Sequence, residues 1–510
     1  MQKSQAAKIS CMEHEWKHDI RPRGILPSKL LASFGRVFYE TSDRLSSTLR
    51  LETSPSDKLD VFLSHVWASA PRARYIGLIW YYNARLASLI SVVVVLVILA
   101  SLSTVLGGRT WVWFEGVSLL TAQSLGALLG TILLFILLFS VHVIRRFFHF
   151  REPLFFMDRC CIEQEDHALK RSEIRMIPQI INKSSSMLIL LTDNYFTRLW
   201  CCYEMAVFTT SSEGSASHVK RTPTVIPVRL AVITLFLILA DLVYVVLIRS
   251  NLRTVGQFSE ASQTRAFIFR VSTCIFSVIV AGLCMGFAIA WGKESRKHIE
   301  VLRSFNLSQV DCSDPADRDV IITDIARRFG SEQKFEEYVR TEILALVTSI
   351  NKPRIRFTLF AGLPQLFSMF GYINILSQRI GLYCMSALDS GFVPKDDSFC
   401  IVLDRQAWAN GVIILAQFVR YVCFYPDVFS LLLIADESIA TRFGTSKLSF
   451  VLSYTSLFLV TSGYFIASNW KFPEEQTLIG QAIESGILFC IFCIIVIIPR
   501  IRSCRFGRHA

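Results

Sequence analysis

Hydrophobic residues form long uninterrupted runs along much of the chain, and several runs reach about 20 residues, the length that crosses a hydrocarbon core. The first, LASLISVVVVLVILASLSTVL, follows Trp80, Tyr81 and Tyr82, which are typical of an interfacial aromatic anchor. The pattern predicts membrane-spanning helices near residues 86–106, 117–144, 230–248, 267–291, 357–378, 409–434, 448–468 and 478–499.

The distribution of basic residues predicts the orientation of these spans. With eight spans, most Lys and Arg residues fall in segments on one side of the membrane, including Arg145 and Arg146 after the second span and the final RIRSCRFGRHA. Basic residues close to the ends of spans remain on the cytosolic side. We therefore expect an integral, multi-pass protein of the lipid bilayer with both termini in the cytosol.

The amino-acid composition also indicates an integral membrane protein. The 510 residues are 52% hydrophobic and 18% charged, whereas an ordinary soluble domain has about 25% charged residues. The 14 cysteines lack the spacing of a zinc site or a disulfide scaffold, so no metal is expected. The net charge of +12 is explained by the cytosolic segments, and no nucleic-acid partner is expected.

Short apolar runs in the cytosolic segments predict a folded module. Buried strands are predicted at 59–67 (LDVFLSHVW), 154–158 (LFFMD), 187–193 (MLILLTD) and 222–228 (TPTVIPV). Between them, one helical face is formed by Ile174, Ile177, Ile180 and Ile181. Because strands alternate with helices, we expect an α/β module with a parallel sheet, split by a two-span insertion within a multi-pass α-helical membrane protein. An even number of crossings returns the chain to the same side of the membrane.

These elements give a domain organisation. It consists of a polar N-terminal region (1–58), the split module (59–228), spans three and four (230–291), a cytosolic helical unit (292–355), spans five to eight (357–499) and a basic tail (500–510). In the N-terminal region, ILPSKLLASFGRVF predicts either a helix on the anionic leaflet or a short soluble helix. In the helical unit, Asp314 and Gly330 delimit one helix, and Ser331 caps the next.

Several motifs of the module occur in a fixed order. A strand ending in Ser64, His65 and Trp67 is followed by D-x-x-C-I-x-Q from Asp158, by R-L-W-C-x-x-E ending at Glu204, and by V-I-P-V. This set resembles the Toll/interleukin-1 receptor (TIR) domain, and more closely a divergent TIR-like family of multi-pass proteins found in protists. Two departures are the membrane spans where TIR domains have a helix and a second strand, and the missing glycine-containing loop after F-x-D.

The resemblance implies signalling through association with other TIR-like modules or with a second copy. It also implies NAD as a ligand or substrate, and no other cofactor is indicated. Glu204 falls on the catalytic carboxylate of NAD-cleaving members, which holds the ribose hydroxyls and stabilises an oxocarbenium-like centre. Because many TIR domains retain this residue without activity, an NAD nucleosidase is the alternative expectation.

Other residues of the motifs are candidate ligand contacts. Tyr195 and Trp200 could stack on a base or pack in the core. Asp158 follows a strand end, where α/β sheets gather ligands, or it pairs with a neighbouring arginine. His65 is either a ligand contact or a polar strand-end residue. Buried thiols are favoured over a metal or redox site for Cys160, Cys161, Cys201 and Cys202.

Ionisable residues inside predicted spans support a second function, a transporter or channel regulated by the module. They are Asp241, Arg420, Asp427 and Glu484, of which Arg420 and Asp427 also interrupt the sixth span. Against this reading, the first, second and fourth spans contain almost no polar residues that could line a pathway.

The loop between the fifth and sixth spans contains two cysteines, Cys384 and Cys400. The predicted topology places this loop on the non-cytosolic face, where a disulfide can form if the membrane belongs to the secretory pathway. Free thiols are the alternative.

Overall fold

The computed structural model describes residues 22–39, 50–106, 119–210, 221–251 and 289–350 apart from 313, and the isolated positions 286, 363 and 367. The chain divides into two compact units. The first, which we call the sheet unit, comprises Met1–Tyr82, His142–Val228 and Glu300–Leu346. The second comprises Asn83–Val141, Arg229–Ile299 and Val347–Ala510.

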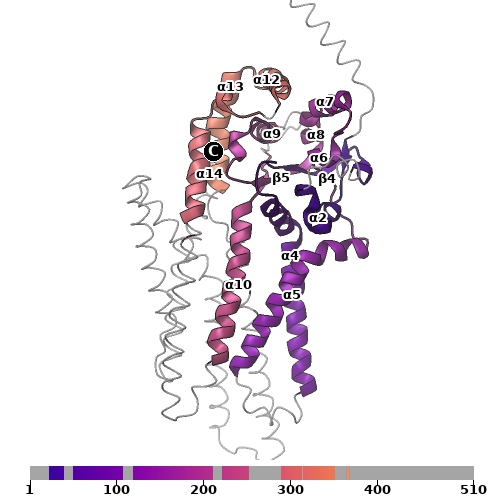
Figure 1. Ribbon diagram of the computed structural model, residues 1–510, viewed down its shortest axis with the longest axis vertical. Helices are drawn as coiled ribbons and strands as arrows, with labels where there is room; N and C mark the ends of the chain where they lie inside the picture. The colour runs from indigo at the N-terminus through magenta and orange to yellow at the C-terminus, as the bar shows by residue number, and fades with distance from the viewer. Residues whose placement is uncertain are drawn as a thin grey trace, which may run out of the picture. The chain divides into compact units, whose positions relative to one another are not determined.

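A four-stranded sheet forms the centre of the sheet unit (Figure 1). Its strands are β3 (Leu59–Ser64), β4 (Phe155–Phe156), β5 (Ser184–Leu191) and β6 (Thr224–Pro227). They run parallel in the order β4-β3-β5-β6. The prediction that segments 59–67 and 154–228 build one parallel sheet is thus confirmed. In chain order this arrangement is 2-1-3-4, as in doubly wound sheets of the flavodoxin-like type.

The central strand β3 ends earlier than predicted. Its register with β5 runs from Leu59↔Ser184 to Ser64↔Ile189, and His65 to Trp67 already belong to the connection with the next helix. The prediction of a strand continuing to Trp67 was wrong. Because the apolar pattern continues through Val66, it could not reveal where ladder pairing stops.

Helices cover both faces of the sheet. Figure 1 shows α8 (Ile177–Lys183) and α9 (Leu199–Thr210) on one face, and α2 (Pro27–Gly35) with the first turns of α4 (Pro71–Leu106) on the other. At Gly77 in α4, an added Cβ would lie 3.4 Å from the Leu190 side chain, so this helix packs closely on the sheet.

The single helical face predicted around Ile174 to Ile181 is divided between two helices. Helix α7 (His167–Arg175) ends at Arg175, and α8 begins at Ile177 after the single residue Met176. Pro178 has no N–H to donate to the carbonyl of Ile174, so the hydrogen-bond ladder cannot continue through it.

The described part of the N-terminal region packs into the sheet unit. Leu30 and Leu31 of α2 are buried, and a 3₁₀ turn at Arg36–Phe38 follows. Strands β1 (Arg23–Gly24) and β2 (Ser54–Pro55) pair antiparallel. Gly35 between the helix and the turn has φ of 67°, which glycine adopts without strain.

Helices also dominate residues 289–350. After a helix at 289–303, α12 (Pro315–Phe329) is followed by α13 (Glu332–Tyr338), a π turn (Val339–Ile343) and α14 (Leu344–Ile350). The predicted cap at Ser331 is confirmed, because its hydroxyl accepts a hydrogen bond from the Lys334 N–H.

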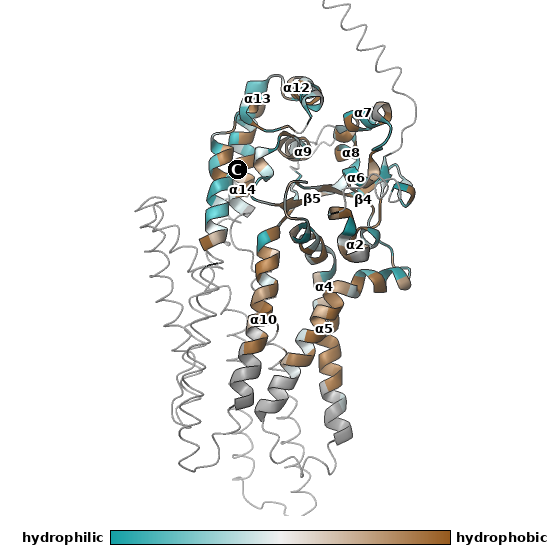
Figure 2. Cartoon of the chain, viewed as in Figure 1, coloured by the Kyte–Doolittle hydropathy of each residue, from teal (hydrophilic) through white to brown (hydrophobic). Residues whose placement is uncertain are grey.

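The second unit contains most of two long apolar helices. Helix α4 and α5 (Leu119–Phe147) each include a segment long and apolar enough to cross a membrane, Pro71–Ile98 and Gly126–Phe147. The Asn83 amide donates to the carbonyl of Leu138 at 2.8 Å and joins the two helices. Hydrophobic residues predominate in α4, α5 and α10 (Val228–Asn251), whereas α13 is largely hydrophilic (Figure 2).

Helices α4 and α5 occupy the positions predicted for the first two spans. Helix α10 lies at the position of the third, and the apolar segment found in its described residues, Val228–Ala240, is shorter than those of α4 and α5. Most of the fourth and fifth spans and all later ones lie outside the described residues, as do Cys384, Cys400, Arg420, Asp427 and Glu484.

Candidate functional site

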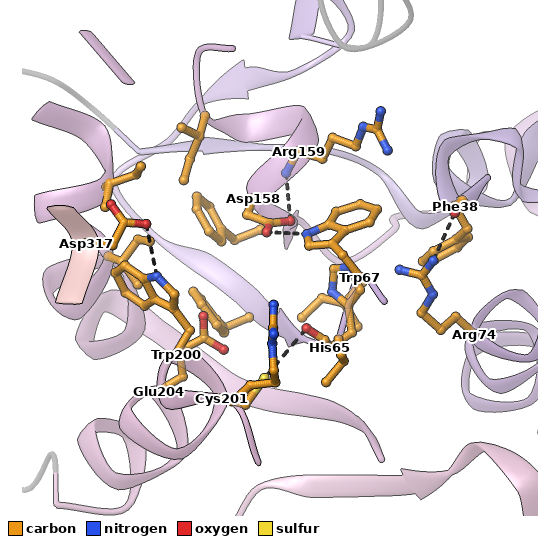
Figure 3. Close-up of a pocket in the computed structure, with 18 of the residues that line it drawn as sticks. Phe38, His65, Trp67, Arg74, Asp158, Arg159, Trp200, Cys201, Glu204 and Asp317 are labelled. Atoms are coloured by element: carbon orange, nitrogen blue, oxygen red, sulfur yellow. Dashed lines mark hydrogen bonds between the residues drawn. The ribbon is translucent and has the colours of Figure 1, made fainter. Parts of the chain in front are cut away.

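A cavity of about 530 Å³ lies in the sheet unit, where the carboxyl ends of β3 and β4 meet the start of α9 (Figure 3). Four of the five candidate catalytic and ligand-contact residues line it: His65, Asp158, Trp200 and Glu204. They come from three separate stretches of the chain. The carboxyl edge of a doubly wound parallel sheet is where such folds bind ligands.

Glu204 lies in the second turn of α9 rather than the first, so the helix terminus gives it little stabilisation. The Ser64 hydroxyl donates to Glu204 Oε2 at 2.6 Å. Burial raises the pKa of Glu204 to about 8, and the Ser64 hydrogen bond only partly opposes this rise. At neutral pH the carboxyl group is therefore mostly protonated.

Tyr195 does not line the cavity, and of the two expectations for this residue its burial agrees with packing in the core. Its ring is fully buried and packs edge-on against Phe196. Its hydroxyl lies 2.7 Å from Ser64 Oγ. A tyrosine whose ring is in the core and whose hydroxyl is paired cannot stack on a ligand; it supports the Ser64–Glu204 hydrogen bond.

His65 follows β3 and lines the cavity with only 8% of its surface exposed. Its Nε2 atom has no hydrogen-bond partner. The ring packs edge-on against Trp67, with 4.4 Å between centroids. Burial lowers the pKa of His65 to about 4, so the imidazole is neutral at pH 7.

Asp158 begins the short helix α6 (Asp158–Cys161) and is held by two donors. Trp67 Nε1 donates to Oδ2 at 2.8 Å, and the Arg159 N–H donates to Oδ1 at 2.7 Å. The guanidinium groups of Arg159 and Arg74 lie 5.2 and 5.1 Å from the Trp67 ring centroid. Trp67 was part of the sequence motif but had not been singled out as a site residue.

No local feature of the sequence marks Arg74 as a site residue. Arg74 lies in the first turns of α4 and lines the same cavity. Its side chain is almost completely buried, and Nη2 donates to the carbonyl of Phe38 at 3.0 Å. Nε and Nη1 have no hydrogen-bond partner.

Asp311 and Asp317, from a distant part of the chain, also line the cavity. Trp200 Nε1 donates to Asp317 Oδ2 at 3.2 Å, and both residues line the cavity. The Leu199 N–H donates to the carbonyl of Asp311, which extends the contacts of α9 to this part of the chain. Tyr203 also donates to Asp324 in α12. No local sequence signal links α9 with a segment more than a hundred residues later.

The cysteines of the motifs are free, buried thiols: Cys160, Cys161, Cys201 and Cys202. Burial raises the pKa of Cys161 to about 12, so this thiol is neutral and unreactive at pH 7. Within the described residues, no group of three or more His, Cys, Asp or Glu side chains is placed to hold a metal ion.

Comparison with known proteins gave no relative: no protein-family model, no curated protein and no solved structure matches this chain.

Proposed function

We propose that this chain is a membrane-embedded signalling protein whose sheet unit is a cytosolic TIR-like module that binds a small ligand, NAD being the first candidate. The observation that carries the proposal is the convergence of His65, Asp158, Trp200 and Glu204 on one cavity at the carboxyl edge of the sheet. The strand order 2-1-3-4 supports a doubly wound module of this kind.

The membrane part of the proposal is supported by exposed apolar side chains on the two long helices. Leu89 and Val97 of α4 are 61% and 58% exposed, and Ile136 of α5 is 58% exposed. Apolar surface of this extent normally faces a partner or lipid. A multi-pass topology with both termini in the cytosol follows from the predicted spans and the basic segments beside them.

Ligand binding is favoured over NAD cleavage because of the state of Glu204. Cleavage needs an ionised carboxylate beside the ribose, whereas a pKa of about 8 leaves about a tenth of the Glu204 side chains ionised at pH 7. A protonated Glu204 can donate a hydrogen bond to a ligand but cannot neutralise a developing positive charge. Signalling would then follow from ligand-dependent association with other TIR-like modules or a second copy.

The full chain in lipid nanodiscs should bind radiolabelled NAD in equilibrium dialysis without releasing nicotinamide. Trp200→Ala should weaken this binding, because Trp200 lines the cavity. Glu337→Gln is a control, because Glu337 is an exposed acidic residue outside the cavity. Absence of NAD binding would refute the nucleotide assignment. Nicotinamide release that disappears in Glu204→Gln would establish the hydrolase instead.

A further inference from the structure

Arg74 is a buried cation that forms no ion pair with any of the residues that the structure describes. Its relative exposure is 1%, and within the described part of the chain no carboxylate forms an ion pair or hydrogen bond with its guanidinium. Removing a charge from water is costly, and buried charges are therefore normally paired. An unpaired arginine at a cavity wall indicates that its partner is a ligand.

The guanidinium group of Arg74 is held in place by its neighbours and still has N–H groups without acceptors. Its Nη2 atom binds the carbonyl of Phe38, and the group lies over the rings of Phe38 and Trp67, at 5.5 and 5.1 Å from their centroids. The N–H groups of Nε and Nη1 are left without acceptors. A fixed guanidinium with free N–H groups is suited to bind the oxygen atoms of an anion.

Two charged groups act on Arg74, namely Asp158 and Arg159. Arg159 lies over the same Trp67 ring as Arg74. Asp158 is the nearby carboxylate whose charge acts on Arg74, but its two oxygens accept hydrogen bonds from Trp67 Nε1 and from the Arg159 N–H. Asp158 therefore acts on Arg74 through its charge alone, and both of its oxygens already accept hydrogen bonds from other groups.

A second buried group without a partner lies beside them. His65 is more than nine-tenths buried, lines the same cavity, and has an Nε2 atom with no hydrogen-bond partner. Figure 3 shows His65 and Trp67 between Arg74 on one side and Glu204 with Trp200 on the other. His65, directly after β3, and Arg74 in α4 thus both contact Trp67, and each has a polar atom without a hydrogen-bond partner.

We propose that the Arg74 end of the cavity binds a phosphoryl group, with the unpartnered N–H groups of Arg74 as its donors. Phosphate oxygens are acceptors that match guanidinium donors. A cavity of about 530 Å³ is in the range of organic ligands and much larger than one anion needs. The remainder of an organic phosphate would extend toward Trp200 and Glu204. This inference rests on the proposed function insofar as both use this cavity, but it does not require the ligand to be NAD.

The test compares adenosine monophosphate with adenosine as probes, using the full chain in nanodiscs and equilibrium dialysis at constant ionic strength. We expect adenosine monophosphate to bind at least about tenfold more tightly than adenosine. Arg74→Met should abolish this difference, and Arg74→Lys should restore part of it. Arg72→Met is the matched control, because Arg72 is exposed, lies on the same helical turn and does not line the cavity.

A thermal-unfolding measurement separates loss of binding from loss of fold. Because Arg74→Met removes an unpaired buried charge, its melting temperature without ligand should not fall, whereas the stabilisation of the wild type by the phosphate probe should disappear. Inorganic phosphate that competes as well as adenosine monophosphate would support the site and identify phosphate itself as the ligand. Equal affinities of the wild type for the two adenosine probes, or equal effects of the Arg72 and Arg74 variants, would overturn the proposal.

The outcomes also distinguish this site from the proposed function. If adenosine monophosphate binds through Arg74 but NAD does not bind, the NAD assignment fails and the phosphoryl site stands. If NAD binds equally well to the wild type and Arg74→Met, the ligand cavity stands and the phosphoryl site is wrong.

Discussion

Replacing Glu204 with glutamine tests the electrostatics of the cavity. The amide has nearly the size of the protonated carboxyl group, and its oxygen can still accept the hydrogen bond from Ser64. Burial raises the pKa of Glu204 from 4.5 to about 8, so the folded state binds a proton that the unfolded chain releases above about pH 4.5. The stability that this proton confers is fully present below pH 4.5 and is lost as the pH rises through about 8.

The magnitude follows from the same shift. One pKa unit corresponds to about 1.4 kcal/mol, so a rise from 4.5 to about 8 corresponds to about 5 kcal/mol as an upper bound. Water entering the cavity reduces this value, and we expect the unfolding free energy of the wild type, relative to Glu204→Gln, to fall by about 2–4 kcal/mol from pH 5 to 8. The variant itself should lack this component of pH dependence.

Hydrogen–deuterium exchange of α9 peptides in the full chain in nanodiscs measures the local opening free energy. Dividing each rate by that of the unfolded peptide at the same pH removes the pH dependence of the exchange chemistry. Glu337→Gln, an exposed glutamate in α13, should retain the wild-type dependence. If Glu204→Gln and the wild type show the same dependence from pH 5 to 8, the carboxyl group titrates normally and the argument for binding over cleavage loses its basis.

Three further predictions concern other groups. Burial lowers the pKa of His65 to about 4. The unfolding free energy of the wild type should therefore fall by up to about 3 kcal/mol relative to that of His65→Asn as the pH falls from 6.5 through 4. Thermal unfolding measures this difference, and identical acid profiles of the two proteins would contradict the prediction. Arg50→Met should lower the unfolding free energy measured in urea by about 3 kcal/mol, because it leaves the buried Glu173 without the guanidinium that lies 2.7 Å away. Adding Glu173→Gln to this variant should recover part of the lost stability. Cys384 and Cys400, which lie outside the described residues, should be labelled by a thiol reagent in intact vesicles only after reduction; labelling of both without reductant would exclude the bridge.

The sequence by itself determined the elements whose signals are local. Each of the four strands overlaps one of the apolar runs, because a strand buried on both faces needs apolar side chains at successive positions. Strand β5 nevertheless begins at Ser184, three residues before its apolar run. The cap at Ser331 and the helix end at Gly330, with φ of 84°, were readable because capping depends on one or two neighbouring residues. Long apolar helices followed from length and composition alone.

Some local signals were ambiguous in a way that only packing resolves. An aromatic residue at the entrance to a helix is compatible with a ligand contact or with the core, and the fold assigned Trp200 to the cavity and Tyr195 to the core. The Tyr195 ring is fully buried by its neighbours in the fold, whereas the Trp200 ring borders the cavity. The Tyr195 hydroxyl is hydrogen-bonded to the Ser64 hydroxyl.

Only the tertiary structure decided what surrounds the candidate residues. Trp67 and Asp158 are 91 residues apart in the chain, and Trp200 and Asp317 are 117 apart. Arg74 has no local mark of function, because an arginine near the start of an amphipathic or membrane helix is ordinary. Its burial, its unpaired N–H groups and its place at the cavity exist only once α4 packs on the sheet, since desolvation depends on every element that covers a group and not on its neighbours in sequence.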